Sequence, residues 1–301
     1  MVELIFDNAD LSVGVYKGND LGSVVVTFTS LMLPSNGVRL DSWNSFRYGF
    51  REQGFIDVKQ TSIFFVAKNN DWYENDSLLK ALVVVKNHDV YKHSNKRILH
   101  GVSMGAYCAS MLCNRLEATS LFLGSPQLLV DFSDAVLEKR WVELRKRINF
   151  THNCALDEIK KFKGRKFIFV DPLHEDDMNQ LSLIGKSLLL DELYFVDGAG
   201  HMAFVYLNKL GVLNEITTSI LSGHDPRSLL NNAKSNIVKE DVNVEAIKKA
   251  IQLPHLADIY REFAIIFKSD QKLHLSLLKK ALKTRPYGPL IRKLYRLAVA
   301  G

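Results

Sequence analysis

The sequence predicts an α/β protein in which a doubly wound, mostly parallel sheet with a helical cap insertion precedes a C-terminal all-α appendage. Up to about residue 222, short β-branched or aromatic runs alternate with longer helical stretches, which is the pattern of βαβ units. The runs in the middle of the chain, such as 167–170, are apolar throughout, as strands covered on both faces should be. From Gly223 onward the strand signals stop.

The elements follow from the hydrophobic period. The predicted strands are 11–16, 23–29, 62–66, 97–100, 120–123, 166–170 and 193–196. The predicted helices between them are 42–53, 78–90, 104–116, 176–189 and 202–221. An insertion at about 128–163 contains apolar residues at helical spacing over 132–148, and we interpret it as a helical cap over the C-terminal edge of the sheet.

The last quarter of the chain has its own composition. Short amphipathic helices are predicted at 243–253, 257–267, 272–282 and 289–298. This part holds 15 Lys and Arg against 7 Asp and Glu, a net charge of +8. The whole chain has a net charge of +6, so residues 1–222 carry −2. The excess is either a solvated helical face or a surface for an acidic polymer, a nucleic acid, a lipid surface or an acidic partner protein. We therefore divide the chain into a domain at 1–222 and a basic appendage at 223–301.

Composition bounds the function classes. The 301 residues are 47% hydrophobic and 24% charged, as in ordinary globular proteins. No apolar run approaches the roughly 18 residues of a membrane span, and the start lacks the basic region of a signal peptide, which predicts a cytoplasmic protein. The three cysteines lack CxxC spacing, and no Walker loop, dinucleotide fingerprint or clustered metal-ligand motif occurs, so no cofactor and no metal are expected.

Residues 96–110 carry the most informative motif: a short strand, then Gly-x-Ser-x-Gly at 101–105, then a helix rich in small residues. This is typical of a nucleophile elbow, a turn so tight that side chains two residues before and after the serine would collide. The motif predicts Ser103 as nucleophile and the Met104 N–H, at a helix N-terminus, as an oxyanion donor. The alternative is a glycine-rich turn that only packs the helix close to the sheet.

Such a serine needs a base, because its free pKa is too high. His201 follows the predicted strand 193–196 and a Gly-Ala-Gly loop, in the chain order Ser, acid, His expected for this arrangement. It is the predicted base. The other histidines considered fit worse, being in a strand, on the loop expected to bear the acid, or in the appendage: His100, His174, His224, His255 and His274.

The acid that orients the imidazole should follow the strand 166–170. Asp171 leaves this strand directly and is our first choice. Asp177 is the second choice, because it and Asp176 lie where first-turn residues of the next helix are favoured by the helix dipole.

Further residues are candidates by position. The Ser30 or Leu31 N–H, after the strand 23–29, is a positional candidate for the second oxyanion donor. Trp72 and Tyr73, on a loop beside the active edge, could stack on a sugar ring or an apolar acyl group, or could pack in the core. Gln127 is grouped with them as a candidate substrate contact.

The elbow at 101–105, Asp171 and the loop ending in His201, in this order on alternating strands and helices, resemble the α/β-hydrolase superfamily over about residues 1–222. The segments 70–73, 124–127 and 285–292 are similar to bacterial α/β-hydrolase-like proteins associated with surface-polysaccharide assembly. The resemblance implies acyl-enzyme chemistry, in which Ser103 attacks a carbonyl and His201 relays the proton. It does not fix the substrate.

Three hypotheses result. The first is a serine hydrolase, most simply a carboxylesterase acting on a small or carbohydrate-linked ester. The second is an acyltransferase or deacetylase that acts on a bacterial surface polysaccharide through the same serine, with a helical lid excluding water. The third, of another class, is a non-catalytic binding protein whose basic appendage docks an acidic partner.

Overall fold

The structure is a computed structural model of the chain. It describes residues 2–30, 52–130, 140–152, 154–185, 192–196, 198–232, 256–266, 268 and 271–300. The chain forms two compact units, Met1–Ile168 and Phe169–Gly301, and each is described by itself. The predicted boundary at residue 222 thus lies inside the second unit, and the division into domains at 1–222 and 223–301 stays a prediction.

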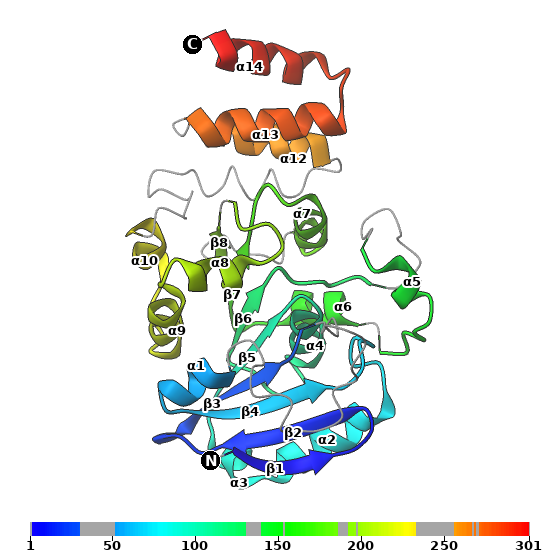
Figure 1. The fold of residues 1–301 in the computed structure, drawn as a ribbon, viewed down its shortest axis with the longest axis vertical. Helices are drawn as coiled ribbons and strands as arrows, with labels where there is room; N and C mark the ends of the chain where they lie inside the picture. The colour runs from blue at the N-terminus through cyan, green and yellow to red at the C-terminus, as the bar shows by residue number, and fades with distance from the viewer. Residues whose placement is uncertain are drawn as a thin grey trace. The chain divides into compact units, whose positions relative to one another are not determined.

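The described part of the chain contains an eight-stranded sheet in the order β1-β2-β4-β3-β5-β6-β7-β8 (Figure 1). Its strands are β1 Val2–Asp7, β2 Leu11–Tyr16, β3 Asp20–Phe28, β4 Gln60–Ala67, β5 Lys96–Val102, β6 Ser120–Gly124, β7 Arg165–Val170 and β8 Leu193–Phe195. The strand β2 is antiparallel to β1 and β4, whereas β4, β3, β5 and β6 pair in parallel. The predicted mostly parallel sheet is confirmed.

Register brings the carboxyl ends of the central strands to one edge. Phe28 at the end of β3 lies opposite Gly101, and Val102 at the end of β5 lies opposite Gly124. The middle residues of β3, β4 and β5 are buried, as expected of strands covered on both faces. This edge is therefore formed by the ends of strands whose middle residues are buried.

The first strand was missed by the sequence analysis. β1 has a mixture of half-buried and exposed residues without regular alternation, and in the described sheet it is the edge strand beside β2. Its sequence, Val-Glu-Leu-Ile-Phe-Asp, was considered only as a possible export signal. Edge strands bury little and carry a weaker pattern than central ones.

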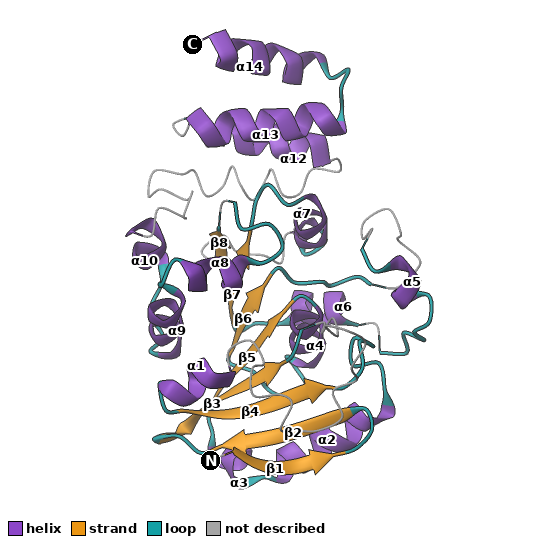
Figure 2. Ribbon diagram, in the orientation of Figure 1, coloured by secondary structure: helices purple, strands orange, loops and turns teal. Residues whose placement is uncertain are grey.

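The helices of the first unit flank the sheet (Figure 2). They are α1 Glu52–Asp57, α2 Asp76–Asn87, α3 Asp89–His93, α4 Met104–Leu112, α5 Val142–Arg145 and α6 Ala155–Lys161. The predicted helix 78–90 is two helices, because His88 has an extended backbone (ψ 140°) and its Nδ1 accepts a hydrogen bond from the Val90 N–H at 3.2 Å. The predicted helix 42–53 lies largely outside the described residues.

The cap prediction is met only in part. Of the predicted helix 132–148, residues 132–139 lie outside the described residues, and the described remainder contains the single turn α5. The nearby helix α6 packs against α4. Arg145 at the end of α5 is buried, and its Nε donates to the Val130 carbonyl at 2.5 Å. A role as a lid stays a prediction.

The second unit contains α7 Glu175–Ser182, α8 Ala203–Lys209, α9 Leu213–Leu221, α10 Arg227–Asn232, α12 Leu256–Ile266, α13 Gln271–Thr284 and α14 Pro289–Ala300. Three of the four helices predicted in the appendage are confirmed, and 243–253 lies outside the described residues. The predicted helix 202–221 is divided into α8 and α9 around Gly211, whose φ of +77° is left-handed. A glycine in this conformation ends a helix without strain.

The appendage does not stand apart from the second unit. The ring of Phe263 on α12 lies 5.7 Å from that of Phe195 on β8. Tyr260, on the same helix, is fully buried. Among the described residues, no helix combines the length and the apolar character needed to cross a bilayer.

Candidate active site

The strand β5 runs through Val102 into Ser103, which is the N-cap of α4. Ser103 has φ +52° and ψ −114°, a conformation that L-residues rarely adopt and that costs about 1–3 kcal/mol. Its N–H donates to the Gly124 carbonyl at 3.0 Å, so the chain is still held to the end of β6 when it turns. A sharp, strained turn between a strand and a helix is the geometry that the motif predicts.

The two glycines of the motif are required by close packing. A Cβ at Gly101 would lie within 3.0 Å of the backbone of Gly105 and Ala106. A Cβ at Gly105 would lie within 3.0 Å of the Phe28 carbonyl group at the end of β3. The steric reason given for the glycines is therefore confirmed.

The oxyanion candidates lie around this turn. Met104 is the first residue of α4, where backbone N–H groups have no acceptor within the helix. The end of β3 approaches the same helical turn, as its contact with Gly105 shows, and Ser30 follows two residues later. Leu31 lies outside the described residues. The donor roles of Met104 and Ser30 stay predictions.

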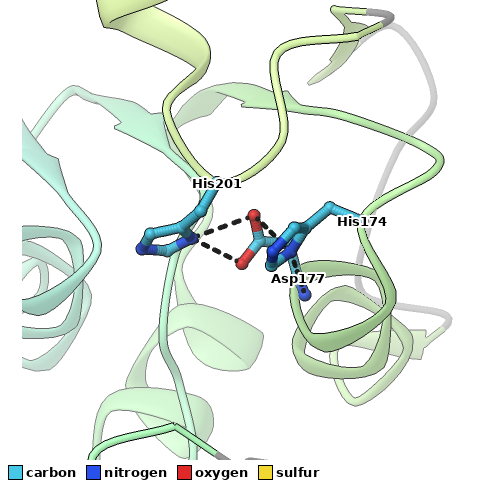
Figure 3. Close-up of side chains that lie close together, drawn as sticks. All are labelled: His174, Asp177 and His201. Carbon is cyan, nitrogen blue, oxygen red and sulfur yellow. Dashed lines mark hydrogen bonds and ion pairs between the residues drawn. The ribbon is translucent and has the colours of Figure 1, made fainter.

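The second unit holds the candidate acids and the candidate base. His201 follows β8 and a loop in which Gly198 and Gly200 have φ of +76° and +56°. Its Nδ1 lies 2.8 Å from Asp177 Oδ1 and 3.0 Å from Asp177 Oδ2. Figure 3 shows the imidazole of His201 facing both oxygens of this carboxylate. Asp177 is completely buried in the first turn of α7, whereas the His201 side chain is 20% exposed. A buried carboxylate on Nδ1 leaves Nε2 as the nitrogen that can accept a proton.

The preferred acid is corrected. Asp171, the first choice, uses one carboxylate oxygen to accept the Leu173 N–H at 2.8 Å and the other to accept the Gly200 N–H at 2.7 Å. It thus ties the end of β7 to the loop that carries His201. The imidazole hydrogen bond goes to Asp177, the second choice, because the helix start directs that side chain back towards the loop after β8.

A second histidine shares the same carboxylate. His174 is the N-cap of α7, and its Nδ1 accepts a hydrogen bond from the Asp177 N–H at 3.3 Å. The same nitrogen lies 3.2 Å from Asp177 Oδ2, and the rings of His174 and His201 are 5.6 Å apart (Figure 3). From the sequence, His174 is a poor candidate for the base, and its contact with Asp177 is not predicted. Its position three residues before Asp177 was the available signal.

The surroundings of Asp177 are acidic. Burial raises the pKa of the Tyr260 hydroxyl, and the carboxylates of Glu175, Asp171, Asp176 and Asp177 raise it further. The Tyr260 oxygen is buried and has no hydrogen-bond partner in the described part of the chain. The helix α12 of the appendage therefore contributes a buried hydroxyl whose pKa is raised by these carboxylates.

The aromatic candidates are corrected as well. Trp72 and Tyr73 are both 0% exposed, so neither ring offers a face to a substrate in this structure. The Trp72 Nε1 donates to Gln127 Oε1 at 2.9 Å, and the Tyr73 hydroxyl is hydrogen-bonded to Thr29 at 3.0 Å. Gln127 is itself completely buried. The packing alternative accounts for all three side chains.

No family model and no curated protein sequence matches the chain. A capsule O-acetyltransferase of Neisseria meningitidis serogroup A matches it in structure with a TM-score of 0.51 at 14% identity, over 72% of this chain and 93% of that one. An esterase of Pyrococcus furiosus matches with a TM-score of 0.44 at 14% identity, over 77% and 91%. Est1E from Butyrivibrio proteoclasticus matches with a TM-score of 0.46 at 11% identity, over 73% and 99%.

The sheet order, the flanking helices and the likeness to the acetyltransferase confirm the predicted α/β-hydrolase type of fold. At this identity the likeness concerns the fold alone. Within the second unit, His201 meets Asp177. The meeting of Ser103 with this pair stays a prediction.

Proposed function

We propose that the chain is a serine acyl-transfer enzyme, most simply a carboxylesterase, with Ser103 as nucleophile, His201 as base and Asp177 as the orienting acid. The observation that carries the proposal is the hydrogen bond from His201 Nδ1 to the buried Asp177 carboxylate. A structural histidine needs no buried anion, whereas a base that becomes positively charged during a reaction is stabilised by one. The strained elbow at Ser103 supports the same conclusion.

The residues divide the chemistry as follows. Asp177 holds the proton on Nδ1, so Nε2 takes the proton of the Ser103 hydroxyl while its oxygen attacks the carbonyl carbon of the ester. The Met104 N–H stabilises the resulting oxyanion. The alcohol leaves with the proton from Nε2, and an acyl-serine remains. Water or a second hydroxyl then attacks this ester with the same nitrogen as base, which releases the acyl group and restores the serine.

The acceptor in the last step decides between hydrolysis and transfer. The structural likeness to a capsule O-acetyltransferase supports, as the alternative, transfer of an acetyl group to a sugar hydroxyl of a bacterial surface polysaccharide, or its removal. Both reactions use the same acyl-serine. A substrate of this class is a small or carbohydrate-linked ester.

A fluorophosphonate probe tests the proposal, because it reacts with an activated serine and not with an ordinary one. We expect labelling of the wild-type chain, no labelling of Ser103→Ala, and slow labelling of His201→Ala. Labelling that survives in Ser103→Ala would contradict the proposal. Release of the acyl group from p-nitrophenyl acetate, with and without an added saccharide, then separates the two acceptors: acceleration by the saccharide favours transfer.

A binding role for the appendage has one observation in its favour. On and before α14, Tyr287 is 84% exposed and Leu297 61% exposed, and they line a hollow together with Arg292, Lys293 and Arg296. Exposed apolar and basic side chains together favour an anionic partner. Binding of poly-glutamate that weakens with salt and is reduced in Arg292→Ala/Arg296→Ala would support this role. Binding unchanged in that variant would contradict it.

A further inference from the structure

The histidine pair on Asp177 has the composition of a metal site. His174, Asp177 and His201 each offer one ligand atom, and these atoms lie within 4.8 Å of one another. Two imidazole nitrogens and one carboxylate oxygen are the protein ligands of many zinc sites, in which water completes a tetrahedron. We propose that this cluster binds a zinc ion and that bound zinc switches off acyl transfer; the second part rests on the function proposed above.

The distances are close to what zinc requires. Ligand atoms about 2.0–2.2 Å from a tetrahedral zinc ion are about 3.3–3.6 Å from one another. Asp177 Oδ2 lies 3.0 Å from His201 Nδ1 and 3.2 Å from His174 Nδ1. These two separations must lengthen slightly, and the third, between the two imidazole nitrogens, lies within 4.8 Å and must come into the same range. The His174 and His201 side chains are 26% and 20% exposed, so an ion can reach them from solvent.

The hydrogen bonding of His174 is also compatible with coordination of zinc through its Nδ1 atom. Its Nδ1 is the acceptor of a hydrogen bond from the Asp177 N–H at 3.3 Å, and the lone pair that accepts this hydrogen bond is the one that a metal ion would use. Zinc binds imidazole nitrogens only in their unprotonated form. The coordination would replace the N-cap hydrogen bond of α7, a helix of eight residues.

The local charge favours a cation. Four carboxylates raise the pKa of the buried Tyr260 hydroxyl, which indicates a negative electrostatic potential around it: those of Asp171, Glu175, Asp176 and Asp177. An ion of charge +2 beside Asp177 is attracted by this potential. The buried Tyr260 oxygen, without a partner in the described residues, adds a polar atom on the same side of the unit.

Zinc binding and base catalysis exclude each other at one atom. In the catalytic arrangement the proton of His201 lies on Nδ1, and Nε2 has the lone pair that accepts the serine proton. Zinc at Nδ1 requires the lone pair there, so the proton moves to Nε2. The imidazole then has no lone pair for Ser103. The carboxylate of Asp177 is shared with the ion at the same time.

The binding part is tested without any activity. Chelator-treated wild-type chain is dialysed against zinc sulfate, and the bound metal is counted by native mass spectrometry. We expect one zinc ion in the wild type and at least about tenfold weaker binding in His174→Asn. Asparagine is a preferred N-cap and keeps the hydrogen bond to the start of α7 while removing the imidazole. His224→Ala is the matched control, an exposed histidine of the same unit that should leave binding unchanged.

The regulatory part uses the rate of probe labelling. Zinc should slow labelling of the wild type and of His224→Ala, and a chelator should restore it. In His174→Asn the zinc concentration for half inhibition should rise by at least about tenfold. Equal zinc binding in wild type and His174→Asn would overturn the site, and zinc that binds without slowing labelling would overturn the switch. A wild type that is never labelled would contradict the proposed function, while the binding experiment would still decide the site.

Discussion

The candidate residues in the first compact unit and those in the second are held in place in different ways. In the first, the elbow is held by backbone packing: Gly105 lies against the Phe28 carbonyl, and Ser103 bonds to Gly124 through its main chain. In the second, side-chain carboxylates hold the residues in place: Asp177 is hydrogen-bonded to His201, and Asp171 accepts a hydrogen bond from the loop before it. The position of Ser103, the candidate nucleophile, therefore depends on close backbone packing. The position of His201, the candidate base, depends on a hydrogen bond to a carboxylate. Substitutions should affect the two halves differently.

The largest effect is expected at Asp177. In Asp177→Asn the amide donates to His201 Nδ1 and moves the imidazole proton to Nε2, which removes the base. The rate of fluorophosphonate labelling should fall by about 10⁴-fold. Stopped labelling time courses measure this rate.

Asp171→Asn is the matched comparison. Its amide oxygen can still accept a backbone N–H, so the labelling rate should fall by about tenfold or less. If Asp171→Asn lost as much as Asp177→Asn, the assignment of the two carboxylates would be reversed.

In the first unit, Gly105→Ala should act through packing rather than charge. Its Cβ would collide with backbone that cannot move independently of β3, which should lower the free energy of unfolding by about 3 kcal/mol or more. Urea denaturation followed by circular dichroism measures the loss.

Gly22→Ala is the control for that experiment. Gly22 is also in β3, has no positive φ, and would meet only the Asp20 side chain at 3.2 Å. The change should be within about 1 kcal/mol. A similar loss in both variants would mean that the close approach at Gly105 is not the cause.

The packing interpretation of Trp72 predicts an intermediate effect. Trp72→Phe removes the donor to Gln127 Oε1 in a site where Gln127 Nε2 is already without a partner among the described residues. The free energy of unfolding should fall by about 1–3 kcal/mol. The labelling rate of the folded variant should change little, whereas a large loss of labelling at unchanged stability would favour a substrate contact instead.

The smallest effect concerns the thiols. Cys154 is half-buried and lines a cavity of about 620 Å³, whereas Cys108 and Cys113 are buried. Burial raises the pKa of Cys154, and the carboxylates of Glu158 and Glu74 raise it further, while burial raises the pKa of Cys113 to about 12.

Because the thiolate reacts and a raised pKa lowers its fraction at neutral pH, Ellman's reagent should modify Cys154 slowly at pH 7 and faster as the pH rises. Glu158→Gln removes a carboxylate that raises this pKa, so it should speed the reaction at a given pH. Glu143→Gln, in the same unit and exposed, should not. Rapid modification of more than one thiol in the native chain would contradict the burial of the other two.

The part of the site that could be predicted from sequence is local. The elbow comprises five consecutive residues, and its steric requirement is visible as two glycines around Ser103. His201 could be selected because it follows a strand and a flexible loop. The hydrogen bond of His201 to Asp177 rather than to Asp171 could not be predicted, since it depends on the direction in which the start of α7 aims a side chain. The burial of Trp72 and Tyr73 depends on neighbours about 40 to 55 residues away in the chain.

The sequence by itself determined the fold class, the strained turn at Ser103 and the chain order of the candidate nucleophile, acid and base, because periodicity and glycine sterics act between near neighbours in the chain. The tertiary structure decided which carboxylate orients His201, that His174 shares it, and that the aromatic pair lies inside. These are contacts between segments that only folding brings together. Hydrogen bonds reach about 3 Å, so a shift of one helical turn changes which acid meets the imidazole.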